Sequence, residues 1–460
     1  MTLITSISGI RGTLGGLPGT GLTPPDIVKF VTAFTGMLKE RTAGTTLRVV
    51  VGRDGRASGA ALSRMVCGTL QFCGADVIDL GLSTTPTVEL AVPWHHAHGG
   101  IILTASHNPA EWNALKLLNE SGEFISEAEG NRILQSAQEA DQMLFPDNRS
   151  LGSYTTDTSA ITRHIEAILR LPMVNREAVR RRNFTVAFDA VNSTGGIALP
   201  PLLEALGVQR VIALNDNPDG RFSHNPEPLP EHLTDLAGII VREKADLGFA
   251  VDPDVDRLAI ISEDGTPFGE EYTLVAVADY ILKSNPGNTV SNLSSSRALR
   301  DVTLRHGGRY HAAAVGEVNV VAAMKEHRAI IGGEGNGGVI LPELHYGRDA
   351  LAGIALFLSH LATTGLSCSA LRKSYPNYFI RKNRVVLDAR TRVEEMFNRL
   401  EKAFPEAEVN RTDGLKLDFD KGWIHLRKSN TEPIIRIYSE ATSETEAEAL
   451  AQRAMEVINP

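Results

Sequence analysis

The sequence predicts an α/β protein made of several domains. Three segments share one order, in which an apolar, β-branched run is followed by a small polar turn and then by a helical pattern. Strands that alternate with helical patterns indicate βαβ units and mainly parallel sheets. Because this order occurs three times, we expect three related α/β domains in a chain whose 460 residues suggest about three or four domains.

Each of the three segments supplies a strand, a turn and a helix. In chain order they lie at residues 47–51, 52–56 and 57–70, at 184–188, 189–193 and 194–206, and at 289–293, 294–296 and 297–306. The C-terminal part differs, because strand-like stretches at Ile424–Leu426 and Ile434–Tyr438 precede an acidic, alanine-rich helix at Glu444–Val457. We therefore expect a last domain of a different kind.

Turn-rich stretches and changes of pattern indicate where the domains meet. Phe145–Tyr154 is rich in turn residues, a second change follows Arg257, and a third falls near Gly365–Ser369. We predict four domains, at residues 1–153, 154–257, 258–367 and 368–460.

Composition narrows the class of protein. The chain is 42% hydrophobic and 22% charged, as in folded globular proteins, and its net charge of −9 argues against non-specific nucleic-acid binding. Its three cysteines form no Cys-x-x-Cys pair and leave an odd number, so we expect no disulfide framework, and a reducing, cytoplasmic location fits. Met1–Gly12 has no apolar signal-peptide core, and the apolar run Ala352–Leu361 is too short for a membrane span, so we expect a buried helix there.

A candidate nucleophile lies in the loop Thr104–Pro109. The loop follows the apolar run Ile101–Leu103, and it places Ser106 among small and polar residues where a strand ends. A serine hydroxyl is a weak nucleophile and needs an activating group or a metal ion. His107 and Lys116 are candidates for that role, although packing for the histidine and simple exposure for the lysine are the alternatives.

Three carboxylates provide a candidate metal site. Asp252, Asp254 and Asp256 alternate, so an extended segment would present them on one side, and hard oxygen ligands suit Mg²⁺. A calcium-binding helix–loop–helix is the alternative, because Glu263 is twelfth from Asp252. Arg257 occupies the sixth position, where that loop needs glycine, and the flanking segments read as strands. Arg257 is then available to contact a phosphate.

Two further loops predict sugar and phosphate binding. Gly332–Gly338 holds five glycines, which allow close approach of a ligand, while Glu334 and Asn336 offer groups that bind sugar hydroxyls. Arg427–Pro433, with Arg436 after it, combines hydroxyls and guanidinium groups into a potential phosphate cradle. An ordinary turn before a strand is the alternative for this second loop. With Ser106 and the carboxylates, these loops suggest metal-assisted phosphoryl transfer.

The serine loop, the three carboxylates and the loops Gly332–Gly338 and Arg427–Pro433 follow one another in this order. Together they resemble the α-D-phosphohexomutase superfamily over nearly the whole chain. Ser8–Thr13 also looks like the N-terminal substrate-facing loop of that family. The resemblance implies an α/β fold of four domains around a central cleft. Three would be related α/β domains with mixed sheets, and the last would be a C-terminal α+β domain like the TATA-box-binding protein.

The resemblance also implies a role for each candidate residue. Ser106 would carry the phosphoryl group, and its phosphate would bind one Mg²⁺ together with Asp252, Asp254 and Asp256. Arg11 and Arg257 would lie at the transferring phosphoryl group, and Lys116 would be the general acid/base, with His107 as the neighbouring alternative. Glu334 and Asn336 would bind the sugar. The other phosphate would be bound by Arg427, Ser429, Asn430, Thr431 and Arg436.

The implied activity is reversible transfer of phosphoryl between C1 and C6 of a small hexose phosphate, through phosphoserine and a hexose 1,6-bisphosphate. Asn113-Ala114 stands where many relatives have Asn-Gly, and Asn336 where many have serine. Because of the second change the sugar stays open among glucosamine, glucose and mannose. Two rival functions are a metal-dependent phosphatase with a phosphoserine intermediate and a non-catalytic sugar- or cation-binding module.

Overall fold

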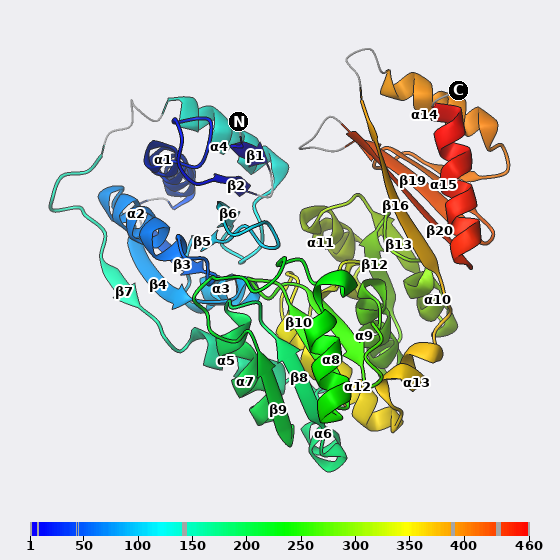
Figure 1. Cartoon of the computed structure of the whole chain (residues 1–460). Coiled ribbons are helices and arrows are strands. Elements are labelled where there is room, and N and C mark those ends of the chain that lie inside the picture. The colour runs from blue at the N-terminus through cyan, green and yellow to red at the C-terminus, as the bar shows by residue number, and fades with distance from the viewer. Residues whose placement is uncertain are drawn as a thin grey trace. The chain divides into compact units, whose positions relative to one another are not determined.

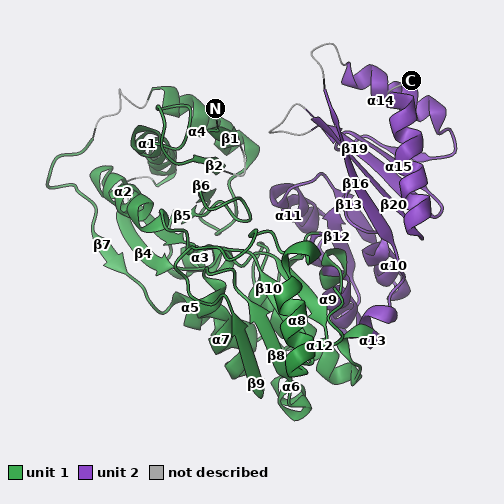
Figure 2. Cartoon of the chain, viewed as in Figure 1, with its two compact units in different colours: residues 1–273, 336–369 green, residues 274–335, 370–460 purple. Residues whose placement is uncertain are grey.

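The computed structural model describes residues 2–6, 9–42, 44, 46–139, 145–387, 392–428 and 434–458 (Figure 1). The chain divides into two compact units, which Figure 2 distinguishes by colour. Unit 1 comprises residues 1–273 and 336–369, and unit 2 comprises residues 274–335 and 370–460.

The first sheet of unit 1 has seven strands in the order β1-β2-β6-β5-β3-β4-β7. Strand β3 is parallel to its neighbours β4 and β5, whereas β6 is antiparallel to β5 and β2, so the sheet is mixed. The strands are β1 Ile4–Ser6, β2 Gly9–Thr13, β3 Arg48–Arg53, β4 Asp76–Leu82, β5 Gly99–Leu103, β6 Trp112–Leu118 and β7 Tyr154–Thr156.

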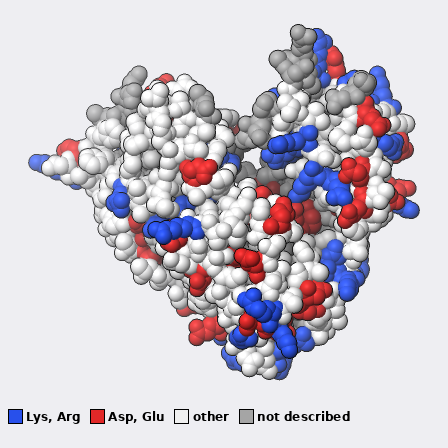
Figure 3. Space-filling model, viewed as in Figure 1, with Lys and Arg blue, Asp and Glu red and all other residues white. Residues whose placement is uncertain are grey.

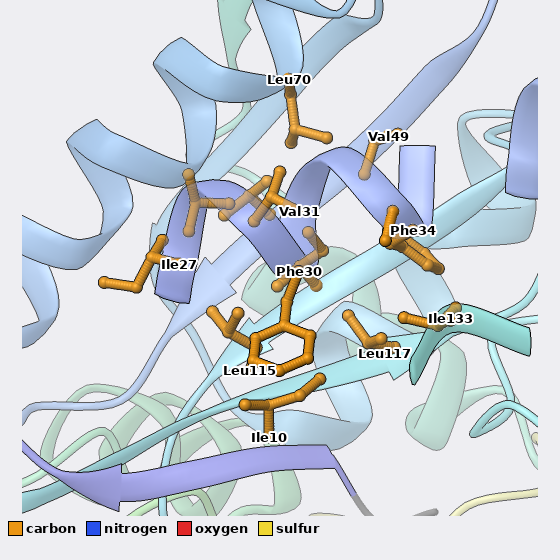
Figure 4. Close-up of a cluster of buried hydrophobic side chains, with 14 of the residues drawn as sticks. Ile10, Ile27, Phe30, Val31, Phe34, Val49, Leu70, Leu115, Leu117 and Ile133 are labelled. Atoms are coloured by element: carbon orange, nitrogen blue, oxygen red, sulfur yellow. The ribbon is translucent and has the colours of Figure 1, made fainter. Parts of the chain in front are cut away.

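Helices cover both faces of this sheet. On one face Val49 and Val51 of β3 join a core formed by α1 Pro24–Arg41, α2 Gly59–Phe72 and α4 Glu127–Gln138 (Figure 4). On the other face Val50 packs with Val88 and Val92 of α3 Thr85–Trp94. Successive strand residues face opposite sides, so a strand segment buried on both faces is apolar, as β5 and the middle of β3, Val49–Gly52, are.

The second sheet has the order β11-β10-β8-β9. β8 is parallel to β9 and β10, and β10 and β11 form an antiparallel hairpin whose connection carries the predicted cation loop. The strands are β8 Thr185–Asp189, β9 Arg210–Leu214, β10 Leu247–Val251 and β11 Leu258–Ser262. The helices are α5 Ala160–Leu169, α6 Arg176–Arg182, α7 Gly195–Leu206, α8 Thr234–Glu243 and the 3₁₀ turn η2 Pro230–His232.

The remaining part of unit 1 follows the glycine-rich loop. β15 Gly338–Ile340 leads to α12 Ala350–Thr364, whose residues from Ala350 to Leu361 are all buried and which packs on α5, α6 and α7. The prediction of a buried helix is thus confirmed. Within the described ranges, no helix has both the length and the apolar character that a membrane span requires.

Unit 2 contains three strands of the third sheet and all described strands of the last one. β12 Asn288–Asn292 lies between its parallel neighbours β13 Tyr310–Ala313 and β14 Ala329–Glu334, with α10 Ala298–Arg305 and α11 Glu317–Glu326. The last sheet is antiparallel, in the order β16-β20-β19-β18-β17, and α14 Val393–Ala403 and α15 Glu444–Ile458 share its core. Its strands are β16 Phe379–Val386, β17 Glu408–Asn410, β18 Leu415–Phe419, β19 Gly422–Lys428 and β20 Ile434–Ala441.

The architecture confirms the predicted fold class, with three α/β parts and a C-terminal α+β part. The strand–turn–helix segments became β3 and α2, β8 and α7, and β12 and α10. Two further helices, α9 Glu270–Ser284 and α13 Cys368–Lys373, lie where the chain passes between units. The exact domain limits remain predictions, and β7 at 154–156 pairs with β4 of the first sheet.

Candidate active site

The predicted serine loop connects β5 to β6 at the end of a fully buried strand. Ser106 has a φ of +50°, in the left-handed region that residues other than glycine rarely adopt, so the loop must be held there by its surroundings. Its Oγ donates a 2.7 Å hydrogen bond to Oδ2 of Asp252 in the β10–β11 hairpin. The predicted nucleophile therefore lies directly against the predicted cation loop.

Asp252, Asp254 and Asp256 lie together in the turn of that hairpin. All three are fully buried, and one ligand atom from each lies within 4.8 Å of the others. Asp252 Oδ1 accepts the backbone N–H groups of Asp256 and Arg257, both at 3.2 Å. Because strands flank the turn, the calcium-binding helix–loop–helix is excluded.

Donors hold one oxygen of Asp254 and of Asp256, whereas the other oxygen accepts no hydrogen bond within the described residues. Asp254 Oδ2 accepts from Lys116 Nζ at 2.7 Å and from Thr85 Oγ1 at 2.6 Å, and Asp256 Oδ2 accepts from Arg348 Nη2 at 2.5 Å. Both Oδ1 atoms are buried and accept no hydrogen bond from any described residue. Such acceptors are costly to bury. A hard divalent cation, which prefers oxygen ligands, fits this donor set.

The carboxylates also repel one another. Burial, followed by the charges of Asp256 and Asp254, raises the pKa of Asp252 well above its ordinary value. Burial alone would lower the pKa of Lys116, but the charges of Asp254 and Asp256 outweigh it and raise that pKa. The lysine therefore carries its proton, and the remaining repulsion is of the kind that a bound cation relieves.

His107 is the group next to the serine hydroxyl. Its Nδ1 lies 3.3 Å from Ser106 Oγ. Burial, followed by the charge of Arg257, lowers the pKa of His107 well below its ordinary value. A neutral imidazole so placed can accept a proton from a hydroxyl, whereas the protonated Lys116 can only donate one.

Two predicted arginines also lie in unit 1. Arg257 Nη1 is 3.5 Å from Glu227 Oε1, and its Nε is 3.9 Å from Asp256 Oδ1. Arg11 on β2 is opposite Ala114 on β6, which places it on the same face of the sheet as Lys116 two residues further along. Burial lowers the pKa of Arg11. Unit 1 thus brings together every predicted residue from the serine and carboxylate loops.

The predicted sugar-binding pair is divided between the units. Glu334, in unit 2, accepts from Asn292 Nδ2 at 2.9 Å and from the Gly316 backbone at 3.2 Å, so its carboxylate is held in one orientation. Asn336, in unit 1, accepts the Gly338 backbone N–H at 3.2 Å. A side chain at Gly337, which has φ +85°, would meet the Leu258 carbonyl, so the loop needs glycine there.

Three arginines form a row across the last sheet. The strand register places Arg427 of β19 opposite Arg436 of β20, and Arg436 opposite Arg384 of β16, which puts all three on one face. Burial lowers the pKa of Arg427, and the charge of Arg436 lowers it further, against the effect of Asp413. Neither Arg384 nor Arg436 is ion-paired within the described part of the chain. Like charges directly opposite one another destabilise a sheet unless an anion lies between them.

The other predicted members of this cradle, Ser429, Asn430 and Thr431, lie outside the described residues. On the face drawn in Figure 3, basic and acidic side chains are interspersed.

Sequence reasoning missed two of the basic residues. Arg348 is 92 positions from its partner Asp256, and no local pattern connects them. Arg384 could have been found, because Lys382 and Arg384 alternate along a strand and alternate residues share a face.

Comparisons with known proteins extend over the whole chain. Family models for phosphoglucomutase/phosphomannomutase match residues 3–143 as α/β/α domain I, 162–265 as domain II, 269–378 as domain III and 388–457 as the C-terminal domain. A phosphoglucomutase/phosphomannomutase of Thermococcus kodakarensis is 36% identical over 442 residues and covers 95% of each chain. A phosphoglucosamine/phosphogalactosamine mutase of Sulfurisphaera tokodaii is 29% identical over 98% of each chain.

A solved structure is similar throughout. The phosphoglucomutase/phosphomannomutase family protein from Burkholderia thailandensis has a TM-score of 0.85 at 27% identity, over 100% of this chain and 99% of that one. Fold and site together define an enzyme of phosphoryl transfer. The chain belongs to the phosphoglucomutase/phosphomannomutase family and is a phosphohexomutase.

Proposed function

We propose that the protein interconverts the 1-phosphate and 6-phosphate of a hexose through phosphoserine at Ser106 and a hexose 1,6-bisphosphate. The observation that carries the proposal is the 2.7 Å hydrogen bond from Ser106 Oγ to a buried cluster of three carboxylates. Phosphoryl transfer needs such a nucleophile beside concentrated charge, because catalysis rests on positioning and electrostatics.

The residues that would hold the cation are Asp252, Asp254 and Asp256, with the Ser106 phosphate. Mg²⁺ bound there would neutralise charge on the phosphoryl oxygens. Lys116 and Arg348 each occupy one carboxylate oxygen and so keep the opposite oxygen of Asp254 and Asp256 available. Arg11 and Arg257 would contact the transferring group.

The two candidate acid/base groups divide the proton transfers between them. His107 is neutral, and its Nδ1 lies 3.3 Å from Ser106 Oγ. It would take the serine proton once the hydroxyl turns from Asp252 towards Nδ1, as Oγ attacks the bisphosphate, and it would return that proton when Oγ leaves. Lys116, which carries its proton, serves the sugar oxygen. This assignment retains both residues, with Lys116 favoured by family resemblance and His107 by its contact with Ser106.

The substrate contacts complete the proposal. Glu334 and Asn336 would bind sugar hydroxyls. The non-transferring phosphate would be bound by the arginine row and the neighbouring loop, comprising Arg384, Arg427, Ser429, Asn430, Thr431 and Arg436. A cytoplasmic location is part of the proposal and is supported by Cys67, Cys73 and Cys368, which are buried and free.

Arg384→Met is expected to raise KM for hexose phosphates about tenfold with little change in kcat, since one charge-assisted phosphate contact is lost. Its free energy of unfolding should stay the same or rise by about 0.2–1 kcal/mol, because repulsion from Arg436 is removed. Arg381→Met on the same strand is the matched control: Arg381 pairs with Glu444, so that variant should keep its KM. An unchanged KM in Arg384→Met would remove Arg384 from the phosphate site.

The activity is tested by comparing isomerisation with phosphate release. Purified protein, primed with glucose 1,6-bisphosphate in Mg²⁺, is given the 1-phosphates of glucose, mannose and glucosamine, and kcat/KM is measured for each. We expect the 6-phosphate of at least one sugar, with free phosphate as a trace product. Free phosphate as the main product from all three would favour the phosphatase, and no turnover would favour a binding module.

A further inference from the structure

The turn that follows β3 contains a buried arginine beside the serine loop. Arg56 is 1% exposed and is among the largest fully buried side chains of the described residues. A buried guanidinium is costly unless its N–H groups are paired, so its partners indicate what it is there to hold.

The guanidinium of Arg56 binds the serine loop through four backbone carbonyls. Nη1 donates to the carbonyls of Pro109 at 2.6 Å and Trp112 at 2.9 Å. Nη2 donates to the carbonyls of Ser106 at 2.6 Å and Asn108 at 2.7 Å. All four carbonyls belong to the short segment 106–112 that presents the nucleophile. The planar, forked guanidinium group of Arg56 therefore fixes the backbone conformation of this segment.

Asp54 connects this fork to the other side of Ser106. Its Oδ2 accepts from Arg56 Nε at 3.0 Å and from Thr104 Oγ1 at 2.7 Å, and Thr104 Oγ1 in turn accepts the Ser106 N–H at 2.9 Å. The backbone N–H and the carbonyl of Ser106 are therefore both fixed from one turn. This arrangement accounts for a serine that stays at φ +50°.

The same turn reaches the carboxylate loop. The Gly55 N–H donates to Ser193 Oγ at 3.0 Å, and Ser193 Oγ donates to the carbonyl of Pro253, between Asp252 and Asp254, at 2.6 Å. A side chain at Gly55 would lie 2.8 Å from Ser193 Cα, so glycine is needed for this contact. One turn thus sets the backbone of both loops that meet at Ser106 Oγ.

We propose that Arg56, with Asp54 and Thr104, is a positioning residue for phosphoryl transfer that holds Ser106 in its left-handed conformation and aims Oγ at the reacting phosphorus. The inference rests on the proposed function of Ser106. Arg56 touches neither substrate nor cation in this assignment and acts only through the loop backbone. Its loss should therefore lower kcat and leave KM, which reports substrate binding elsewhere, nearly unchanged.

Arg56→Lys tests the fork directly, because an ammonium keeps the charge but cannot reach four carbonyls in one plane. We expect kcat for hexose 1-phosphate isomerisation to fall about 10²-fold and KM to change by less than about threefold. Thr104→Val, a change of similar volume, guards against misfolding of the first variant. It should lower kcat about tenfold, whereas Thr104→Ser, which keeps both hydrogen bonds, should restore it.

Ile133→Ala, a cavity variant in the core of the same sheet, provides the control for lost stability. The inference is overturned if Thr104→Val and Thr104→Ser have equal kcat, or if Arg56→Lys loses no more kcat than Ile133→Ala does. Absence of isomerase activity in the wild-type protein would instead refute the proposed function. The two failures are therefore distinguished within one set of assays.

Discussion

Ser106→Ala is expected to lower isomerase activity at least about 10³-fold, because the hydroxyl proposed to carry the phosphoryl group is lost. The fold should survive, since the change removes one hydroxyl and its 2.7 Å hydrogen bond to Asp252. Intact mass spectrometry after incubation with glucose 1,6-bisphosphate should detect a phosphorylated wild-type protein and an unphosphorylated variant.

A matched serine variant separates this effect from general damage. Ser126→Ala removes the exposed cap of α4, so it should cost some stability while keeping both phosphorylation and activity. A Ser106→Ala protein that still becomes phosphorylated and turns over at the wild-type rate would show that the carrier lies elsewhere.

Asp252→Asn is expected to separate activity from stability. Activity should fall at least about 100-fold, because the variant loses a cation ligand. Loss of a group that only supports such a ligand already lowers metal affinity or activity by about 10–100-fold. Without metal, however, the variant should be at least as stable as the wild type at neutral pH. The pKa of Asp252 is raised by burial and then by Asp256 and Asp254, so its charged form is the unfavourable one in the folded state.

The raised pKa of Asp252 also determines how the stability difference between the wild type and Asp252→Asn depends on pH. A carboxyl whose pKa is raised on folding binds its proton more tightly in the folded state, so it lowers stability as pH rises above its unfolded value of about 3.9. The advantage of Asp252→Asn in Tm, measured with EDTA, should therefore grow from pH 5 to pH 8. Added Mg²⁺ should raise Tm more for the wild type than for the variant.

Asp76→Asn provides a control in which folding shifts the pKa of the carboxyl in the opposite direction. Hydrogen bonds from Ser153 lower the pKa of Asp76, so its charged form is favoured in the folded state and its loss should reduce stability at neutral pH. A drop in metal-free Tm in both variants would contradict the account of carboxylate repulsion at Asp252.

The parts of the structure that sequence predicts well are local ones. β3 with α2 and β8 with α7 follow from apolar runs that end in small polar turns. Ser106 and the alternating Asp252, Asp254 and Asp256 are recognisable because their chemistry is concentrated in a few consecutive residues. Neighbouring residues of one loop stay together whatever the rest of the fold does.

Contacts between distant segments are what sequence could not supply. The Arg348 pair with Asp256 and the Arg56 contacts to the serine loop depend on tertiary packing. The row formed with Arg384 depends on strand register, which only the assembled sheet determines. The protonation of His107 could not be predicted from sequence either. Its pKa is lowered first by burial, which no local pattern reports.

The fate of the phosphoryl group on Ser106 shows whether this residue passes it to a hexose phosphate. Protein labelled on Ser106 with radioactive phosphate is freed of excess label, mixed with unlabelled hexose 1-phosphate, and quenched at short times. The expected result is that label leaves the protein as hexose bisphosphate and hexose phosphate, and that it stays on the protein when sugar is omitted. Label released as inorganic phosphate, at the same rate with and without sugar, would contradict it.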